Sequence, residues 1–387
     1  MRQNHCIGCD GRKAQIEGDE IGNYSRFIID ALAKSCGSST YFHLYAPHEG
    51  QSEEFRALTE RENIEATEPD GLFWRLVHPL WQLTKLSKDA KQNNVELFLG
   101  LNNDIPWGLS YNNIRSVITI HDIGYLNRTT HMNLPKHFLM SLWLKSACER
   151  ADRIIAVSEE TKRDIVKRLN INPDKIDVIH YGCHTRYTER ISDEQKSSIK
   201  KRYTLPERYI LTETPHKHYK NIEQTLRALP LLPDDLHYVV VGRRTRHTTR
   251  LEDMTYMLKL TERVHFIERV DECDTPTIYS LAEAYVTTSR HSGFSSSIVK
   301  ALNVGIPVIA TTGTSHEEAG GAHSIYIAPN NHKELAEKIN MLHESPQLRE
   351  KIVSQGRRHA RQFRGEVIAY NLINSFQRIG IDLTRLR

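Results

Sequence analysis

The stretch IIAVSEETKRDIVKRLNINPDKIDVIHYGC, residues 154–183, begins and ends with short runs rich in β-branched residues, which is the pattern of buried strands. Between these runs, SEETKRDIVKRL (158–169) has apolar residues at helical spacing. Ser158 precedes this helical segment, where its hydroxyl can cap the first turn. The stretch therefore predicts parallel strands covered by a helix.

The same alternation continues on both sides of this stretch. Towards the N-terminus the predicted strands are HCIGCD, STYFHLYAP, VELFLGL and SVITIHD, with amphipathic helices that include 22–35 and 134–149. Towards the C-terminus the predicted strands are RYILTE, HYVVVG, VHFIE, AYVTTS, PVIATT and SIYIAP, separated by helices near 221–229, 275–283, 295–304 and 332–343. The sequence thus predicts an α/β protein.

The length and one polar segment predict two domains. A chain of 387 residues is too long for one ordinary core. The polar segment 184–204 separates the two series of strands and is the expected linker, with the boundary near residue 185. Because ligands bind beyond the carboxyl ends of strands in open α/β sheets, we expect functional residues in the loops that follow these runs.

Composition excludes several classes of protein. The chain is 39% apolar and 26% charged with a net charge of +4, which is ordinary for a folded domain and modest for a nucleic-acid-binding one. No run of about 18 apolar residues and no apolar signal core occurs, so the sequence predicts a cytoplasmic protein. Its six cysteines are scattered, which predicts a reduced protein with no metal site. No G-x-G-x-x-G pattern of a dinucleotide-binding dehydrogenase follows an early strand.

Four segments resemble the retaining glycosyltransferases of family 4. They are CIGCDGRKAQIEGDEIGNYSRFIIDALA near the start, ITIHDIGYL, the stretch 154–183, and PVIATTGTSHEEAGGAHSIYIAP near the end. The resemblance covers nearly the whole chain and implies the GT-B fold, in which two Rossmann-like domains face each other across a cleft. It implies an acceptor-side domain at 1–185, a donor-binding domain at 186–365 and a C-terminal helix at 366–387 that packs back towards the first domain.

The resemblance also implies roles for residues of the first half. Gly22 would let amides at a helix N-terminus approach the donor diphosphate, although a glycine there can also serve only a turn. His121 and Asp122 would lie at the reacting sugar as catalytic residues, whereas a histidine at a strand end can also be purely structural. Trp74 and Trp81, in the segment 49–90, are candidates for acceptor contacts or for packing.

In the second half the resemblance assigns donor binding to two further groups of residues. Lys220 would contact the diphosphate and Asn221 lies beside it in the family's Lys-Asn helix start. The other donor-site candidates are Ser292, Gly293, Phe294, Glu317 and Glu318. Each charged candidate can also be explained without a ligand. Lys220 can be a surface lysine, and Glu317 and Glu318 can be carboxylates in the first turn of a helix.

The sequence departs from the family's pattern at the donor site. Ser292 and Lys300 stand where the family has two glutamates, and a lysine cannot accept the hydrogen bonds of ribose hydroxyls. Thr214 and Pro215 replace a glycine and a basic residue. Side chains that could compensate against the diphosphate are His216, Lys217, Arg243 and Arg244.

Two functions follow from these observations. The first, which the resemblance implies, is a metal-independent enzyme without cofactor that transfers a sugar, with retention, from a nucleotide-sugar donor to a saccharide or lipid-linked acceptor in cell-surface polysaccharide synthesis. The alternative is a catalytically degenerate partner or saccharide-binding scaffold, because a fold does not carry its activity with it. The sequence also leaves open a partner glycosyltransferase and a peripheral contact with the inner membrane surface. The basic run 357–364 is one candidate for that contact. No nucleic-acid partner is expected.

Overall fold

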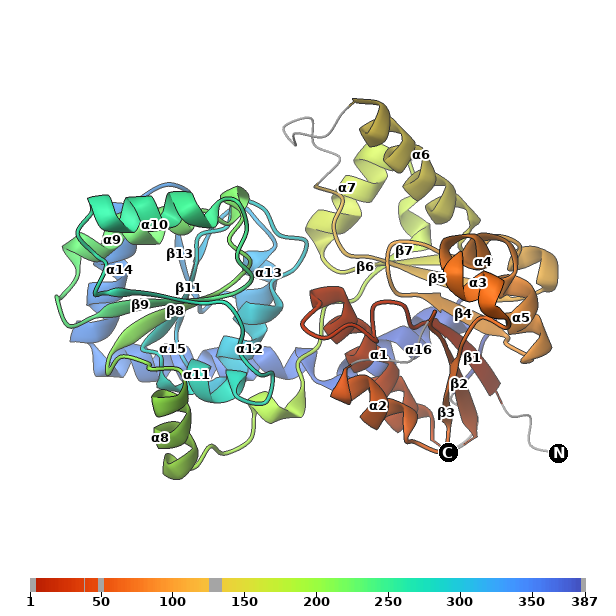
Figure 1. Cartoon of the computed structure of the whole chain (residues 1–387), viewed down its shortest axis with the longest axis horizontal. Helices are drawn as coiled ribbons and strands as arrows, with labels where there is room; N and C mark the ends of the chain where they lie inside the picture. The colour runs from red at the N-terminus through yellow and green to blue at the C-terminus, as the bar shows by residue number, and fades with distance from the viewer. Residues whose placement is uncertain (1–4, 38, 48–51, 125–133, 384–387) are drawn as a thin grey trace. The chain divides into compact units, whose positions relative to one another are not determined.

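The structure is a computed structural model that describes residues 5–37, 39–47, 52–124 and 134–383. It divides into two compact units, residues 1–182 with 363–387, and residues 183–362. Each unit is built around its own parallel sheet (Figure 1). The α/β class with two parallel sheets is as the sequence predicted.

In the first unit the strand order is β3-β2-β1-β4-β5-β6-β7. The strands are β1 (His5–Asp10), β2 (Thr40–Tyr45), β3 (Ile64–Thr67), β4 (Leu97–Gly100), β5 (Arg115–Ile120), β6 (Arg153–Ala156) and β7 (Ile176–Val178). The helices are α1 (Glu20–Cys36), α2 (Glu53–Thr59), α3 (Leu72–Leu76), α4 (His78–Thr84), α5 (Leu86–Gln92), α6 (Leu134–Arg150), α7 (Glu159–Leu169) and α16 (Gly365–Gln377). The apolar core combines central strands with side chains from α4, α5, α6 and α7.

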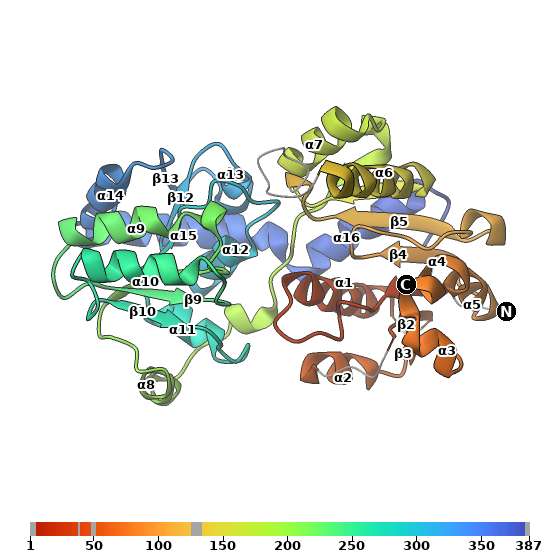
Figure 2. The same ribbon diagram turned by 45° about the horizontal axis from the view of Figure 1, so that its top comes forward.

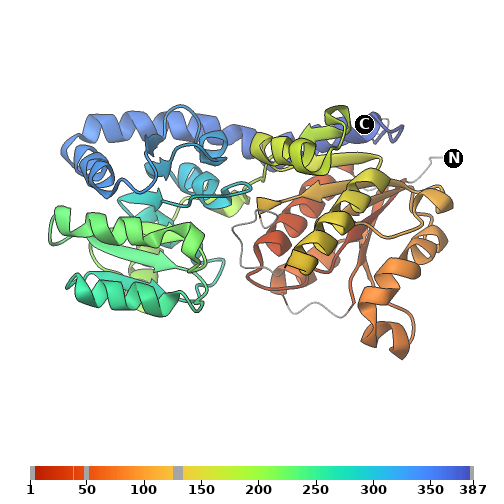
Figure 3. The same cartoon turned by 90° about the horizontal axis from the view of Figure 1, so that it is seen from above.

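The last helix of the chain belongs to the first unit. α16 packs on α1 and buries Leu372 and Phe376, while Ser375 and Arg378 donate hydrogen bonds to Asp177 in the middle of β7. Figures 2 and 3 show this helix in dark blue. The first unit is therefore completed by a helix that follows the whole second unit in the sequence.

In the second unit the strand order is β10-β9-β8-β11-β12-β13. The strands are β8 (Tyr209–Glu213), β9 (His237–Val241), β10 (Val264–Ile267), β11 (Ala284–Thr287), β12 (Val308–Thr311) and β13 (Ile325–Ile327). The helices are α8 (Asp193–Arg202), α9 (Ile222–Ala228), α10 (Thr248–Met257), α11 (Thr275–Leu281), α12 (Ser296–Val304), α13 (His316–Gly320), α14 (His332–Glu344) and α15 (Pro346–Ala360). Figure 1 shows α9, α10 and α14 above this sheet and α8, α11, α12 and α15 below it.

The predicted helix start at Ser158 is confirmed, because its hydroxyl accepts a hydrogen bond from the Thr161 amide at 3.0 Å. All twelve predicted strand segments contain a strand, but β3 was missed. This short edge strand buries only Ile64 and so lacks the apolar run by which the others were recognised. No helix among the described residues is long and apolar enough to span a bilayer.

Candidate functional site

The second unit gathers loops at one edge of its sheet. Residues 214–221 follow β8, 242–247 follow β9, 288–295 follow β11 and 312–315 follow β12. These four strands are neighbours in the order β9-β8-β11-β12 and run parallel, so the loops emerge side by side. This is the edge of the sheet at which ligands bind in open α/β folds.

The loop 214–221 is fixed by backbone contacts with the neighbouring loop. The Thr214 amide donates to the Val241 carbonyl at 2.7 Å, and the His216 amide donates to the Arg243 carbonyl at 3.1 Å. Gly242 has a φ of 150°, and a Cβ on it would lie 2.1 Å from the Thr214 carbonyl oxygen. Only a glycine allows the two loops to approach so closely.

Asn221 anchors this loop to the one after β11. Its amide nitrogen donates to the Thr288 carbonyl at 3.2 Å, and the Thr288 hydroxyl donates to the Asn221 carbonyl at 2.8 Å. Asn221 is buried and adopts a left-handed backbone with φ 53°. Its side-chain oxygen also accepts from the Arg290 guanidinium at 2.9 Å, so the structure uses Asn221 to hold two loops together.

Two basic side chains of this loop lie near the ring of Tyr219. The Lys220 and Lys217 ammonium groups are 5.4 and 5.8 Å from the centre of the Tyr219 ring. The Arg290 amide donates to the Tyr219 carbonyl at 2.9 Å, which brings a third basic residue next to them. Sequence reasoning missed Arg290, because the residue lies 70 positions after Lys220 and only the sheet brings them together.

The four predicted compensating residues differ in what they can offer. Lys217 is half-buried and Arg243 exposed, whereas Arg244 pairs with Glu252. His216 lies fully buried beneath the loop, and burial lowers its pKa to about 4. His216 is therefore uncharged at neutral pH and offers no positive charge to an anion.

The Lys300 side chain is directed at another side chain of the second unit. Its ammonium group lies 2.9 and 3.0 Å from the two carboxylate oxygens of Glu213, the last residue of β8. Tyr279 and Ser297 also donate hydrogen bonds to this carboxylate. Burial by itself would raise the pKa of Glu213, but Lys300 and these donors outweigh it and hold that pKa below its usual range. Burial would conversely lower the pKa of Lys300, and the carboxylate raises it well above its usual value.

The remaining predicted donor-site residues lie after β11 and β12. Ser292 and Phe294 are buried, and Gly293 between them is half-buried. The Ser292 carbonyl accepts from the Ser315 hydroxyl at 2.7 Å, which links the two loops. Glu317 is exposed and accepts from Thr312 and from the Gly313 amide, and these hydrogen bonds lower its pKa. Glu318 is half-buried in the same short helix.

In the first unit, His121 follows β5 and is 5% exposed. Its Nε2 lies 2.8 Å from the Leu101 carbonyl, which can only accept, so Nε2 carries the proton and Nδ1 accepts from the Tyr181 hydroxyl. Burial lowers the pKa of His121 to about 4, so the ring is neutral at pH 7. Tyr24 of α1 packs its ring edge-on at 4.8 Å.

Two further predicted residues adjoin this cluster in the sequence, because Asp122 follows His121 and Gly22 comes two positions before Tyr24. The Asp122 carboxylate accepts from the Gly124 amide at 2.6 Å. Gly22 is in the first turn of α1, where its amide donates to the side chain of the N-cap residue Asp19 at 3.0 Å. A Cβ at Gly22 would lie 2.5 Å from the Lys13 carbonyl oxygen, so the preceding loop also requires a glycine here.

A second polar cluster of the first unit was not predicted. Arg12 binds Asp10 through two nitrogens, at 2.8 and 2.6 Å, and also donates to Gln82. The Gln82 amide then donates to Asp104 at 3.1 Å. Burial raises the pKa of Asp104. Asp10 and Arg12 are two positions apart, but Gln82 and Asp104 come from two other segments, so no spacing in the sequence could have revealed the whole cluster.

The two candidate tryptophans are packing residues in the structure. Trp81 is buried in the core of the first unit and donates from its ring nitrogen to Asp89 at 2.7 Å. Trp74 is half-buried and packs against the same core.

Two family models match the chain over its two units. A model described as Glycosyltransferase Family 4 matches residues 28–187, and one described as Glycosyl transferases group 1 matches residues 194–359. O-antigen chain mannosyltransferase B of Escherichia coli is 25% identical over 312 residues, 79% of this chain and 79% of that protein. O-antigen chain mannosyltransferase RfbU of Salmonella typhimurium is 25% identical over 233 residues, 59% of this chain and 61% of that protein.

Solved structures have the same fold over nearly the whole length. Anabaena Alr3699/HepE, in complex with UDP and glucose, aligns with a TM-score of 0.76 at 19% identity and covers 97% of this chain and 99% of that one. WaaG, a glycosyltransferase involved in lipopolysaccharide biosynthesis, aligns with a TM-score of 0.69 at 14% identity over 97% of this chain and 100% of that one. At these identities the likeness concerns the fold.

Proposed function

Because this chain belongs to family 4 of the glycosyltransferases, we propose that it transfers a hexose from a nucleotide-sugar donor to a saccharide acceptor with retention of configuration. Its similarity to O-antigen mannosyltransferases supports a place in cell-surface polysaccharide synthesis, with mannose as the first sugar to test. We assign donor binding to the second unit and acceptor binding to the first.

The observation that carries this proposal is the basic loop edge of the second unit. Lys217 and Lys220 lie near the Tyr219 ring, and the Arg290 side chain bonds to Asn221 of the same loop. A departing nucleoside diphosphate develops negative charge, and fixed cationic groups and amides stabilise that charge in the transition state. In our proposal these three side chains supply that stabilisation without a separate cofactor, and the half-buried Gly293 with Ser292 borders the sugar.

For His121 we propose a contact with the transferring sugar in the neutral form. A neutral imidazole held by Leu101 and Tyr181 cannot act as a cationic acid at pH 7. Asp122 stands beside it as the second candidate for a sugar contact. We propose that Gly22 lets amides of the first turn of α1 approach the donor diphosphate.

Nucleotide titration tests the proposal. The purified protein is titrated with UDP, GDP, UDP-glucose and GDP-mannose, and its melting temperature is followed; a nucleotide that binds the native state raises it. Lys220→Ala should weaken binding about tenfold, as expected when one charge-assisted phosphate contact is lost. The matched control is Lys201→Ala, an exposed lysine on α8, a helix that supplies none of these loops. If none of the four ligands stabilises the protein at millimolar concentration, the proposal fails.

The anomeric outcome is tested separately. Incubation with the donor that binds and an oligosaccharide acceptor, followed by NMR of the product, should give the same anomeric configuration as in the donor. An inverted product would refute retention while leaving the transfer activity in place.

The second candidate function is a nucleotide-binding scaffold without turnover. The observation that favours it is the Lys300–Glu213 ion pair, because it occupies a side chain that would otherwise be available to a ligand. This function predicts nucleotide binding with neither sugar transfer nor donor hydrolysis, so the same titration combined with an assay for released nucleotide distinguishes the two.

For the acceptor we propose a lipid-linked saccharide reached at a membrane surface. Phe138, Leu139, Leu142 and Trp143 on α6 are 65%, 66%, 47% and 39% exposed, and their spacing places them on one side of the helix. An exposed apolar stripe of this kind favours an interface with lipid. Binding to vesicles that contain anionic phospholipid should fall in a Phe138→Ser/Leu142→Ser variant but not in Tyr256→Ser, an exposed residue on α10 of the other unit. Equal binding of all three proteins would contradict this assignment.

A further inference from the structure

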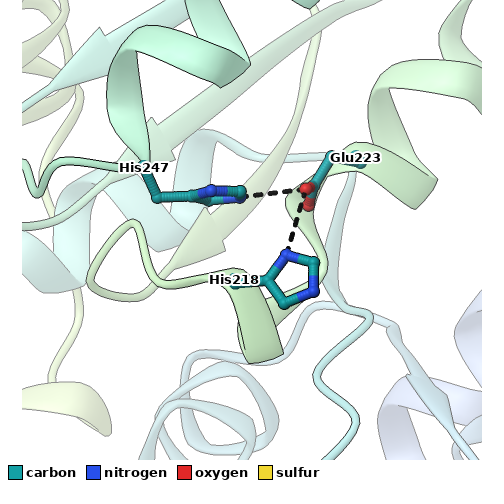
Figure 4. A group of neighbouring side chains, drawn as sticks. All are labelled: His218, Glu223 and His247. Carbon is teal, nitrogen blue, oxygen red and sulfur yellow. Dashed lines mark hydrogen bonds and ion pairs between the residues drawn. The ribbon is translucent and has the colours of Figure 1, made fainter. Parts of the chain in front are cut away.

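Three potential metal ligands meet at the loop edge of the second unit. His218 comes from the short 3₁₀ helix His218–Lys220, Glu223 from the first turn of α9, and His247 from the residue before α10. Figure 4 shows both imidazole rings directed at the Glu223 carboxylate. One ligand atom from each residue lies within 4.8 Å of the others.

The distances are close to those of a metal site. Glu223 Oε1 is 2.9 Å from His247 Nε2 and 3.8 Å from His218 Nδ1. Ligand atoms about 2.0–2.1 Å from a tetrahedral zinc ion are about 3.3 Å apart. The two observed distances lie on either side of this value, and all three ligand atoms lie within 4.8 Å of one another, so side-chain rotations would bring them to one ion.

A second observation points to a missing cation. Glu223 is only 6% exposed, and its other carboxylate oxygen, Oε2, is buried without a hydrogen-bond partner among the described residues. A buried carboxylate oxygen without a donor is costly, and native proteins pair nearly all such atoms. A divalent ion at Glu223 would neutralise the carboxylate charge, and bidentate binding would also give Oε2 a partner.

The exposure of the ligands shows how an ion could enter. The His218 side chain is 65% exposed, whereas those of His247 and Glu223 are 15% and 8% exposed. An ion would thus be reached from solvent on the His218 side, where a water molecule can complete a four-coordinate site.

We propose that His218, Glu223 and His247 bind one divalent transition-metal ion of the zinc type. Two imidazole nitrogens and one carboxylate oxygen suit zinc and its first-row neighbours, whereas Mg²⁺ and Ca²⁺ prefer oxygen ligands only. The ion ties the loop 214–221 to α9 and to the start of α10, and so fixes the segment that carries Lys217 and Lys220. Its role is structural, and it stands whether or not these lysines bind a nucleotide.

Cobalt titration tests this site directly. The full-length protein, without a histidine tag and stripped with EDTA, is titrated with Co²⁺, and the visible d–d absorption of four-coordinate Co²⁺ is recorded. We expect one equivalent to bind and one equivalent of Zn²⁺ to displace it. His218→Ala, which removes an exposed side chain, should weaken binding at least about tenfold, since even residues that only orient metal ligands contribute 10–100-fold.

The matched control is His265→Gln. His237 and His265 form another imidazole pair in the same unit, 2.9 Å apart, on β9 and β10. This variant should bind Co²⁺ as the wild type does. Glu223→Gln keeps a polar group beside His247 but loses the anionic ligand, and it should abolish the d–d absorption. Wild-type affinity in His218→Ala and Glu223→Gln, or no binding by the wild type, would overturn the proposal and leave an ordinary His247–Glu223 ion pair.

Discussion

At the scale of single residues, the Lys300–Glu213 pair changes the meaning of a departure from the family's pattern. From the sequence, Lys300 appeared only as the loss of a carboxylate. In the structure, Glu213 from β8 lies against Lys300 from α12 and balances its charge. Glu213 lies 87 positions before Lys300 in the sequence. The lysine at this position therefore has a partner inside its own unit and contributes to the packing there.

Lys300→Glu should therefore destabilise the protein instead of restoring a donor contact. It would place two carboxylates together in a site where the paired side chains are only 20% and 23% exposed. Breaking a buried pair costs about 3–5 kcal/mol, and this partial exposure reduces the expected loss in the free energy of unfolding to about 2–4 kcal/mol. Urea denaturation measures the loss.

Two variants control this experiment. Lys333→Glu makes the same charge change at an exposed position on α14 and should alter stability by less than about 0.5 kcal/mol. The swapped pair Glu213→Lys/Lys300→Glu should recover part of the loss. Equal stability of Lys300→Glu and Lys333→Glu would mean that the ion pair contributes nothing to the free energy of unfolding.

Buried histidines predict that stability decreases in mild acid. Burial lowers the pKa of His121 and of His316 from 6.5 to about 4. Between these values the unfolded chain binds protons that the folded chain does not, so the free energy of unfolding falls as the pH falls through this window. From pH 7 to pH 5 the loss is about 2 kcal/mol for each histidine.

Urea denaturation at the two pH values checks this expectation. His316→Gln should lose less stability than the wild type between pH 7 and pH 5, whereas His323→Gln, at an exposed position, should behave as the wild type. A wild-type protein equally stable at both pH values would contradict the prediction.

At the scale of elements, the loops at the carboxyl ends of the strands depend on close backbone approach. Gly242 is the clearest case, because the space for a Cβ is already filled by the Thr214 carbonyl, 2.1 Å away. The loop it supports carries Lys217 and Lys220 in the next turns.

Gly242→Ala should destabilise the protein by more than about 3 kcal/mol and weaken nucleotide binding, because the loop after β8 must move. Gly313→Ala is the matched control, since Gly313 also has a positive φ of 78° but no atom within 4 Å of an added Cβ. That variant should cost only about 1–2 kcal/mol of backbone strain. Calorimetry and nucleotide titration of both variants make the comparison; equal losses would show that close approach is unimportant.

The elements themselves were largely predictable. Runs such as HYVVVG and AYVTTS are apolar because β9 and β11 are buried in the middle of a parallel sheet. The short helices α3, α4 and α5 were not predicted, because their stability comes from tertiary contacts such as Trp81 in the core and not from a strong local pattern.

At the scale of the whole molecule, the chain leaves its first unit, builds the second and returns with α16. The match of two family models confirms the predicted family, and both units contain the predicted parallel sheets. Because α16 completes the first unit, damage to this last helix should act on residues far away in the sequence.

Phe376→Asp should lower protection from hydrogen exchange in residues 5–182 and leave residues 183–362 protected. Phe376 is fully buried, and an unpaired carboxylate in an apolar core is strongly unfavourable. Tyr370→Asp, on the same helix but 64% exposed, should leave both units protected. Loss of protection in the second unit alone would contradict the assignment of α16.

The sequence by itself determined the α/β class, the family and all the described strands except β3, because these depend on local periodicity and on short motifs along the chain. It also identified the loops that carry Lys220, Ser292 and His121. Only the tertiary structure decided what these side chains contact. Glu213 reaches Lys300, Tyr181 and Leu101 hold His121, and Glu223 meets His247. Each of these contacts joins segments that are far apart in the sequence. The packing of a sheet or of its loops brings them together, and the spacing of residues along the chain does not predict such contacts.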